Sequence, residues 1–237
     1  MSIIRTIVKK PLNLVGLDLV RYHPRYSLGE YGYISSLNIR TVIDVGAHTG
    51  EFAKMISRIL PGVTVLSFEP LGEEFRQLEA GLVSIPNARA FNYAIGDQSE
   101  TLEMHRSDFS QSSSLRAMAQ LHKEAFPESA GETLELVEVR RLDDVLKEIS
   151  IEPEILLKID VQGYEDKALA GAVNSLARSR AVIVEVSFRE LYEGQPLFDA
   201  TYHTLQRAGF SYMGNLYQLV HPTDRSVLQA DALFVRF

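Results

Sequence analysis

Short apolar runs alternate along the chain with amphipathic stretches that repeat at helical spacing. In the clearest case, an apolar run at 41–45 ends in a glycine-containing turn, and Phe52, Met55 and Ile59 follow on one predicted helical face. The pattern predicts strands at 41–45, 63–68, 88–95, 154–160 and 181–186, and helices at 50–60, 71–83, 141–149, 164–178 and 197–208. Strands that alternate with helices indicate an α/β fold with a parallel sheet covered on both faces.

The C-terminal part of the chain has a different pattern. Residues 210–220 and 226–237 are both strand-like, and only residues 221–225 connect them. A parallel crossover needs about a dozen residues or more, so this short connection predicts an antiparallel hairpin.

Residues 99–140 also interrupt the alternation. They hold strand patterns at 101–104 and 133–139 around a polar stretch at 110–114. We expect an insertion over one face of the sheet, near the substrate site, although a merely solvated loop would have the same composition.

The composition is that of a globular protein and excludes several chemistries. The 237 residues are 46% hydrophobic and 23% charged, which suits a single domain at 1–237. The absence of cysteine excludes thiolate catalysis, disulfides and cysteine-bound metals. A net charge of −7 opposes binding to a phosphate backbone, so we expect no nucleic-acid partner.

The first 36 residues are predicted to form an N-terminal helical extension. Basic Arg5, Lys9 and Lys10 stand among apolar residues, and Pro11 interrupts the pattern. No apolar run reaches the roughly 18 residues of a membrane span, and we expect neither a signal peptide nor a location outside the cytoplasm. Packing on the domain is favoured over contact with a membrane surface. The sequence leaves the oligomeric state open.

The turn after residues 41–45 is typical of a nucleoside site. Gly46 permits a sharp turn, Gly50 lets a ligand approach the amides at a helix N-terminus, and Glu69 follows the next strand, where an acid can bind ribose hydroxyls. A dinucleotide fingerprint from Gly46 would need glycine at His48 and Glu51, and no P-loop lysine follows. S-adenosylmethionine fits this pattern, although an ordinary strand-to-helix turn would also contain glycines.

Several segments together resemble the FkbM-type family of S-adenosylmethionine-dependent methyltransferases. The resemblance runs from about Leu37 to Phe237. Its landmarks are VIDVGAHTG at 42–50, FEP at 68–70, AIGD at 94–97, LDD at 142–144, LKIDVQGYE at 157–165 and YEGQPLF at 192–198. The sequence departs from the commonest family pattern at His48, where asparagine is frequent, and at Gln162, where glutamate is frequent. The second departure puts in doubt any role that rests on an acid at 162.

The resemblance implies a Rossmann-like class I methyltransferase fold, with a seven-stranded, mostly parallel sheet and an antiparallel C-terminal strand. It also implies O-methyl transfer to a hydroxyl of a sugar, a glycan or a polyketide-like natural product. The acceptor itself cannot be read from the sequence.

The expected cofactor site lies at the carboxyl ends of the strands. Asp44 would contact the methionine ammonium, directly or through water, unless it is a buried acid that caps its own turn. We expect Glu69 to bind the ribose, with Pro70 stiffening the chain beside it. The remaining expected contacts are the backbone of Gly46, Ala47 and His48 to the methionyl end, Ile95 and Asp97 to the adenine, and Asp160 beside the sulfonium.

The expected catalytic element is the strand end that carries Lys158 and Asp160. Strand alternation places both on one face, and buried polar residues there need a partner or a use. Asp160 can orient a hydroxyl and accept its proton, while Glu185 or His48 could serve instead. An ion pair of Lys158 with Asp160 or Glu185 is the structural alternative.

Other functions are less well supported by the sequence. Nitrogen methyltransferases often carry an Asn/Asp-Pro-Pro-aromatic loop after the fourth strand, where this chain has DVQGY at 160–164. No metal is expected, because Asp160 lacks an accompanying Asp-Asn pair and the histidines are not clustered. A catalytically silent methyltransferase-like scaffold and, less favoured, a nicotinamide-nucleotide dehydrogenase stay open.

Overall fold

The computed structural model describes residues 29–237. The predicted N-terminal extension lies mostly outside these residues; within them, Gly29–Leu37 form a 3-10 helix, η1. The division of the chain into one domain with an extension and an insertion stays a prediction. Among the described residues, no helix has both the length and the apolar character that crossing a bilayer requires.

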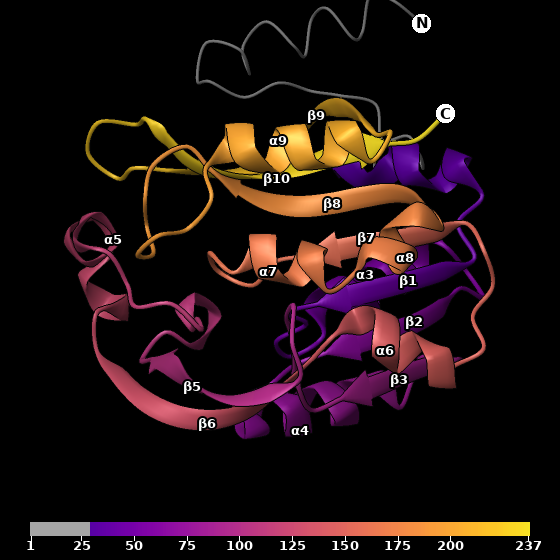
Figure 1. Ribbon diagram of the computed structural model, residues 1–237, viewed down its shortest axis with the longest axis horizontal. Coiled ribbons are helices and arrows are strands. Elements are labelled where there is room, and N and C mark those ends of the chain that lie inside the picture. The colour runs from indigo at the N-terminus through magenta and orange to yellow at the C-terminus, as the bar shows by residue number, and fades with distance from the viewer. Residues whose placement is uncertain (1–28) are drawn as a thin grey trace, which may run out of the picture.

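A seven-stranded sheet forms the centre of the fold, in the order β3-β2-β1-β7-β8-β10-β9 (Figure 1). Strands β3, β2, β1, β7 and β8 pair in parallel, whereas β10 is antiparallel to both β8 and β9. The predicted mostly parallel sheet and the C-terminal hairpin are therefore confirmed. The strands are β1 (Thr41–Val45), β2 (Thr64–Phe68), β3 (Ala88–Phe91), β7 (Ile155–Ile159), β8 (Ser179–Ser187), β9 (Ser211–Val220) and β10 (Val227–Val235).

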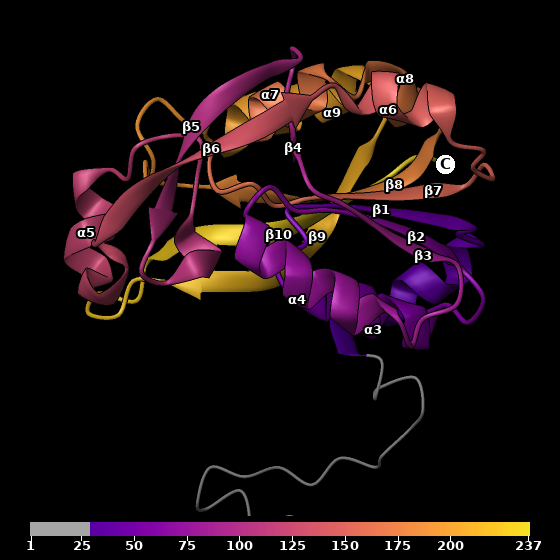
Figure 2. The same cartoon turned by 90° about the horizontal axis from the view of Figure 1, so that it is seen from below.

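Helices cover both faces of this sheet, as Figure 2 shows. Alternate residues of the central strands face two separate apolar cores: Ile43 and Leu157 pack in one, Val42 and Leu156 in the other. The second core is covered by α3 (Glu51–Ile59) and α4 (Gly72–Leu82). The first is covered by α6 (Leu142–Val145), α7 (Glu165–Ala170), α8 (Val173–Ala177) and α9 (Phe198–Arg207).

The single strand predicted at 88–95 is wrong, because the chain changes sheets within it. After β3 it leaves the large sheet, and β4 (Ala94–Ile95) joins a small second sheet of order β4-β6-β5. Asn92 stands at the break, and its Nδ2 donates to the carbonyl oxygens of Glu69 and Pro70, at 3.0 and 2.9 Å. This side chain anchors the chain as it crosses from one sheet to the other.

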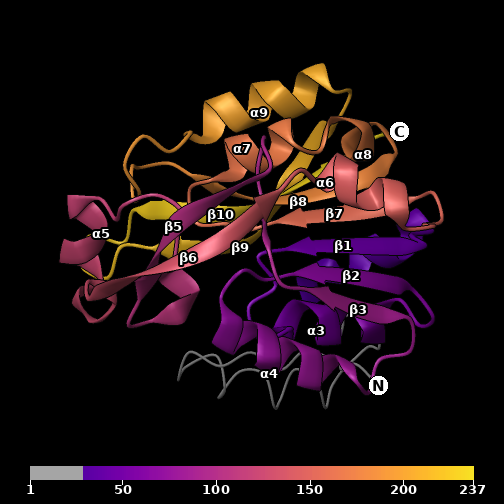
Figure 3. The ribbon, with the colours of Figure 1, turned by 60° about the horizontal axis from the view of Figure 1, so that its bottom comes forward.

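The second sheet lies beside the edge of the large sheet where β1 and β2 end (Figure 3). Its long strands β5 (Glu100–Ser107) and β6 (Glu132–Arg140) are antiparallel. Between them run η2 (Ser110–Ser112), α5 (Gln120–Ala125) and η3 (Pro127–Ser129). The segment 99–140 is therefore ordered around a hairpin rather than a free loop.

The helix predicted at 164–178 is also wrong in its length, since residues 171–172 divide it into α7 and α8. A Cβ at Gly171 would lie 1.9 Å from the carbonyl oxygen of Gly96, so the two backbones meet where only glycine fits. The carboxylate of Asp143 caps the N-terminal end of α8. It accepts hydrogen bonds from the backbone N–H groups of Asn174 and Ser175, both at 2.8 Å, and from the Ser175 hydroxyl at 2.7 Å. The predicted helix at 141–149 likewise shortens to α6, followed by the 3-10 helix η4 (Leu146–Glu148).

Asp143→Ala should lower the free energy of unfolding by about 2–3 kcal/mol, because it leaves buried amide groups at the start of α8 without an anionic acceptor. The neighbouring Asp144 is the matched control, since it makes an exposed ion pair with Lys147. Asp144→Ala should change the free energy by less than about 0.5 kcal/mol. Urea denaturation measures both, and equal effects would contradict the capping role.

Candidate active site

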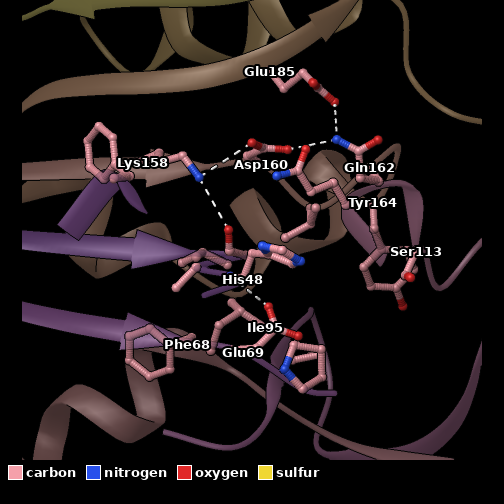
Figure 4. Close-up of a pocket in the computed structure, with 18 of the residues that line it drawn as sticks. His48, Phe68, Glu69, Ile95, Ser113, Lys158, Asp160, Gln162, Tyr164 and Glu185 are labelled. Carbon is pink, nitrogen blue, oxygen red and sulfur yellow. Dashed lines mark hydrogen bonds and ion pairs between the residues drawn. The ribbon is translucent and has the colours of Figure 1, made fainter. Parts of the chain in front are cut away.

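A cavity of about 710 Å³ opens at the carboxyl ends of β1, β2 and β7. Its volume is sufficient for a ligand the size of a nucleoside derivative. It collects most of the residues singled out from the sequence, and Figure 4 shows several of them. The predicted residues that line it are Gly46, Ala47, His48, Glu69, Pro70, Ile95, Lys158, Asp160 and Glu185.

Three other predicted residues, Asp44, Gly50 and Asp97, do not line the cavity. Asp44 is fully buried behind it. Gly50 has φ +83°, a left-handed conformation that favours glycine, and a Cβ there would lie 2.9 Å from a terminal carbon of Leu78 on α4. The backbone turn therefore accounts for this glycine without a ligand contact. The carboxylate of Asp97 pairs with Lys167 at 2.8 Å. Ile95 alone of the predicted adenine pair faces the cavity.

Gly46 sets the floor of the cavity. It has φ +77°, and its amide donates to the Phe68 carbonyl oxygen at 3.0 Å, as does the amide of Ala47. A Cβ at this position would lie 1.8 Å from the carbonyl oxygen of Asp160. The ends of β1 and β7 can therefore come this close only because residue 46 is glycine.

Glu69 is held in place by backbone amides. Its two carboxylate oxygens accept N–H groups of His48 and Leu71, both at 2.9 Å. Burial raises the pKa of Glu69 to about 7, although these two hydrogen bonds oppose the shift. Each oxygen retains a lone pair, so the group can accept further hydrogen bonds from the cavity.

His48 links the turn after β1 to the segment between β5 and β6. It adopts φ +49°, and its Nε2 lies 2.7 Å from the Ser110 hydroxyl. Burial lowers the pKa of the imidazole, which keeps it neutral at pH 7. The ring therefore joins two walls of the cavity through a neutral hydrogen bond.

Lys158 lies in register with Asp44 on the neighbouring strand. Its Nζ is 3.3 Å from Asp44 and 3.4 Å from Asp160, and it donates to the Gly46 carbonyl oxygen at 3.3 Å. Burial alone would lower the pKa of Lys158, but the surrounding carboxylates raise it above its ordinary value. Lys158 is thus a permanent cation and cannot act as a base. The ion pair with Asp160 that the sequence left open is present.

Asp160 and Glu185 are bridged by the side-chain amide of Gln162 (Figure 4). The Gln162 Nε2 donates to Asp160 Oδ1 and to Glu185 Oε2, each at 2.9 Å. Burial raises the pKa of Glu185 well above its usual value, and the charge of Asp160 adds to the effect. The arrangement therefore places a partly exposed carboxylate, Asp160, beside one that resists ionisation.

Glu165, the first residue of α7, supports the loop between β7 and α7. Its Oε1 accepts the amides of Val161 and Gly163, both at 3.1 Å, and it does not line the cavity. Burial raises the pKa of this group to about 7.

Sequence reasoning missed the amide and phenol groups around the two acids. Gln162 was noticed only as a departure from glutamate, and its left-handed φ of +53° was not foreseen. Tyr192 donates to Gln162 Oε1 at 2.7 Å, and Gln229 donates to Glu185 at 2.8 Å. Only the antiparallel register of β10 against β8, which pairs Gln229 with Ser187, could have indicated the second contact.

The comparison with protein families identifies the chain. The family described as "Methyltransferase FkbM domain" matches residues 44–212, which is most of the sequence. The protein therefore belongs to the FkbM methyltransferase family.

Two curated proteins show sequence similarity. The 2-O-methyltransferase NoeI of Sinorhizobium fredii is 29% identical over 161 residues, which cover 65% of this chain and 66% of NoeI. The AMB antimetabolite synthetase AmbE of Pseudomonas aeruginosa is 29% identical over 213 residues, 78% of this chain but 10% of AmbE. The chain thus spans just under two thirds of the first relative and a small part of the second.

Solved structures with a similar arrangement include a fibrillarin from Aeropyrum pernix with natively bound S-adenosyl-L-methionine. It is 14% identical, has a TM-score of 0.47, and the match covers 83% of this chain and 67% of that one. An rRNA methylase from Streptococcus thermophilus is 10% identical with a TM-score of 0.48, over 92% and 99% of the two chains.

Lys158→Met should destabilise the fold by about 3–5 kcal/mol, because it leaves the Asp44 carboxylate buried without a counter-charge. The double variant with Asp44→Asn should be less destabilised than the sum of the single changes, by about 1–3 kcal/mol. Urea denaturation of the four proteins gives this coupling.

The more exposed pair Lys167–Asp97 provides the control cycle. Lys167→Met and Asp97→Asn should couple by less than about 1 kcal/mol. A coupling energy between Lys158 and Asp44 no larger than that of the control pair would show that the buried pair does not support the strand ends.

Proposed function

We propose that the protein transfers a methyl group from S-adenosylmethionine to a hydroxyl of an uncharged sugar, glycan or natural product. The observation that carries the proposal is Asp160, a partly exposed carboxylate that lines the same cavity as the nucleoside-type turn at Gly46 and as Glu69. The name of the relative NoeI, a 2-O-methyltransferase, supports oxygen as the methylated atom.

The residues around the cavity fit this cofactor. Glu69 would accept the ribose hydroxyls, the turn at Gly46, Ala47 and His48 would face the methionyl end, and Ile95 would pack on the adenine. Pro70 fixes the chain beside Glu69. Asp44 acts through Lys158 in this proposal, since its buried position excludes direct contact. The cofactor supplies an electrophilic methyl group on a positively charged sulfur.

The chemical step requires alignment of the acceptor oxygen and removal of its proton. As the new C–O bond forms, the bond from the methyl carbon to sulfur breaks and its electron pair stays on sulfur. The hydroxyl proton passes to Asp160, whose carboxylate lies 3.4 Å from the ammonium of Lys158. Glu185 lies in the same site but resists ionisation, and the Nε2 of His48 is hydrogen-bonded to the Ser110 hydroxyl. Asp160 is therefore our choice as proton acceptor.

The charges of the cavity favour an acceptor without phosphate. Asp160 and Asp231 line it together with Lys158, and Glu185 adds a carboxyl group that resists ionisation. The Lys158 ammonium already contacts Asp44 and Asp160, so it offers little to a ligand anion. Ser110 and Gln111, from the segment between β5 and β6, add neutral polar groups. Neutral hydroxyl-rich molecules suit such a lining better than phosphorylated ones.

The affinity for S-adenosylhomocysteine should rise by up to about ninefold between pH 6 and pH 8 through Glu69. With a pKa of about 7, this group is about 10% ionised at pH 6 and about 90% at pH 8, and only the carboxylate accepts both ribose hydroxyls. Calorimetric titration should show a flatter profile in Glu69→Gln. Glu51→Gln, at an exposed acid of the same cavity, is the control and should keep the wild-type slope. Identical slopes in all three proteins would refute the ribose assignment.

Asp160→Asn should lower turnover by about 100-fold or more, while the affinity for S-adenosylhomocysteine stays within a few fold, because the change removes a proton acceptor without removing a cofactor contact. Transfer of tritium from methyl-labelled S-adenosylmethionine to a panel of neutral and phosphorylated oligosaccharides measures the rate and the acceptor class together. Near-normal turnover would assign the proton to another group, and a preference for phosphorylated acceptors would contradict the charge argument.

A further inference from the structure

The side chain of Gln162 connects the two acids of the site with the wall of the cavity. It lies in the turn after β7, where its backbone is left-handed and its side chain contacts Asp160. One amide nitrogen contacts both Asp160 and Glu185, at equal distances of 2.9 Å. The backbone carbonyl oxygen of the same residue accepts the Ser114 hydroxyl at 2.6 Å. A single residue thus contacts the turn after β7, strand β8 and the segment between β5 and β6.

We propose that Gln162 is a positioning residue, whose neutral amide fixes the carboxylates of Asp160 and Glu185 relative to each other and joins them to the 110–114 segment. The inference rests on the proposed function, in which Asp160 accepts the proton of the acceptor hydroxyl.

The orientation of the amide is set by Tyr192. The Tyr192 hydroxyl donates to Gln162 Oε1 at 2.7 Å, and the side chain of Tyr192 is fully buried. Burial raises the pKa of this phenol well above its usual value, so it stays a donor. The opposite orientation would turn the amide carbonyl toward two carboxylates and its NH₂ group toward the phenol. In the observed orientation the NH₂ group faces both acids, and Oε1 is the nearer of the two acceptors, at 2.7 and 3.0 Å, that share the one proton of the Tyr192 hydroxyl.

Gln162 has an uncharged side chain in acidic surroundings, so it adds no further negative charge to the pair of acids. The titratable groups that interact with Asp160 or Glu185 are Lys158 on β7, Glu165 on α7, Asp231 on β10, Tyr192, His48 in the turn after β1 and, behind Lys158, Asp44. Lys158 is the one cation of this set. A glutamate at 162 would bring a third carboxylate within hydrogen-bond distance of the first two, so a proton would have to be shared among them. The amide instead donates to both acids without adding charge.

The same network reaches the polar wall of the cavity. Tyr192 also contacts the carbonyl oxygen of Ser112 at 3.0 Å, and Ser114 contacts the Gln162 backbone. Ser110 and Gln111 of this wall line the cavity. The position of the acids is therefore coupled by hydrogen bonds to the segment that would face the acceptor.

An infrared titration of the unliganded protein tests the proposal without any methyl acceptor. The experiment uses Glu185→Gln as background, so that Asp160 is the remaining acid of the pair, and the Asp160 band is assigned by its loss when Asp160→Asn is added. In this background Gln162→Met should raise the midpoint for ionisation of Asp160 by about one pH unit, a tenfold change, because the carboxylate loses a donor. Gln162→Glu should raise it at least as far through like charge.

Gln229→Met is the matched control. Gln229 donates to Glu185 at 2.8 Å and to Ser187, with no contact to Asp160 given by the structure, so its replacement should leave the midpoint within about 0.3 pH unit. An unchanged midpoint in Gln162→Met would overturn the proposal. If that variant fails to fold, an unchanged midpoint in the isosteric Gln162→Glu would overturn it. Calorimetry with S-adenosylhomocysteine is done in parallel; failure of the wild type to bind would overturn the proposed function, whereas the Asp160 midpoint would still decide the role of Gln162.

Discussion

The burial of one lysine between two carboxylates determines the shape of the site. Asp44 and Lys158 lie opposite each other on β1 and β7, on the sheet face that otherwise packs apolar side chains. Burial raises the pKa of Asp44, and the Lys158 ammonium 3.3 Å away opposes that shift and stabilises a carboxylate that has no exposed surface. The same ammonium lies 3.4 Å from Asp160, the first residue after β7. The ammonium of Lys158, which stabilises the buried Asp44, therefore also holds Asp160 at the cavity.

Close approach of backbones completes this arrangement. Gly46 lets the end of β1 contact the Asp160 carbonyl oxygen, and Gly171 lets the break between α7 and α8 contact Gly96. In both places a side chain would overlap a carbonyl oxygen. At the edge of the cavity, the amides of Gly46 and Ala47 donate to the Phe68 carbonyl oxygen. The Glu69 carboxylate accepts two further backbone amides. Rigid support of this kind keeps a ligand-binding site in a defined geometry without a ligand.

Much of the fold could be predicted from sequence, since strands such as 41–45 and 155–159 are largely apolar and lie between helical patterns. Site residues near the carboxyl ends of the strands, such as Gly46 and Lys158, could be predicted because ligands bind at this edge of an α/β sheet. The network around Gln162 could not be predicted, because it needs Tyr192 and Gln229 from distant segments. The burial of Asp44 and the pairing of Asp97 with Lys167 likewise depend on tertiary contacts. The change of sheet at Asn92 was hidden by a continuous strand-like pattern.

A crystal structure of the protein with S-adenosylhomocysteine tests the account most directly. The account predicts both ribose hydroxyls on the Glu69 carboxylate, the adenine against Ile95, and the sulfur on the side of the cavity that holds Asp160, with the Lys158 contacts to Asp44 and Asp160 retained. A nucleoside bound elsewhere, or one whose ribose leaves Glu69 uncontacted, would contradict it.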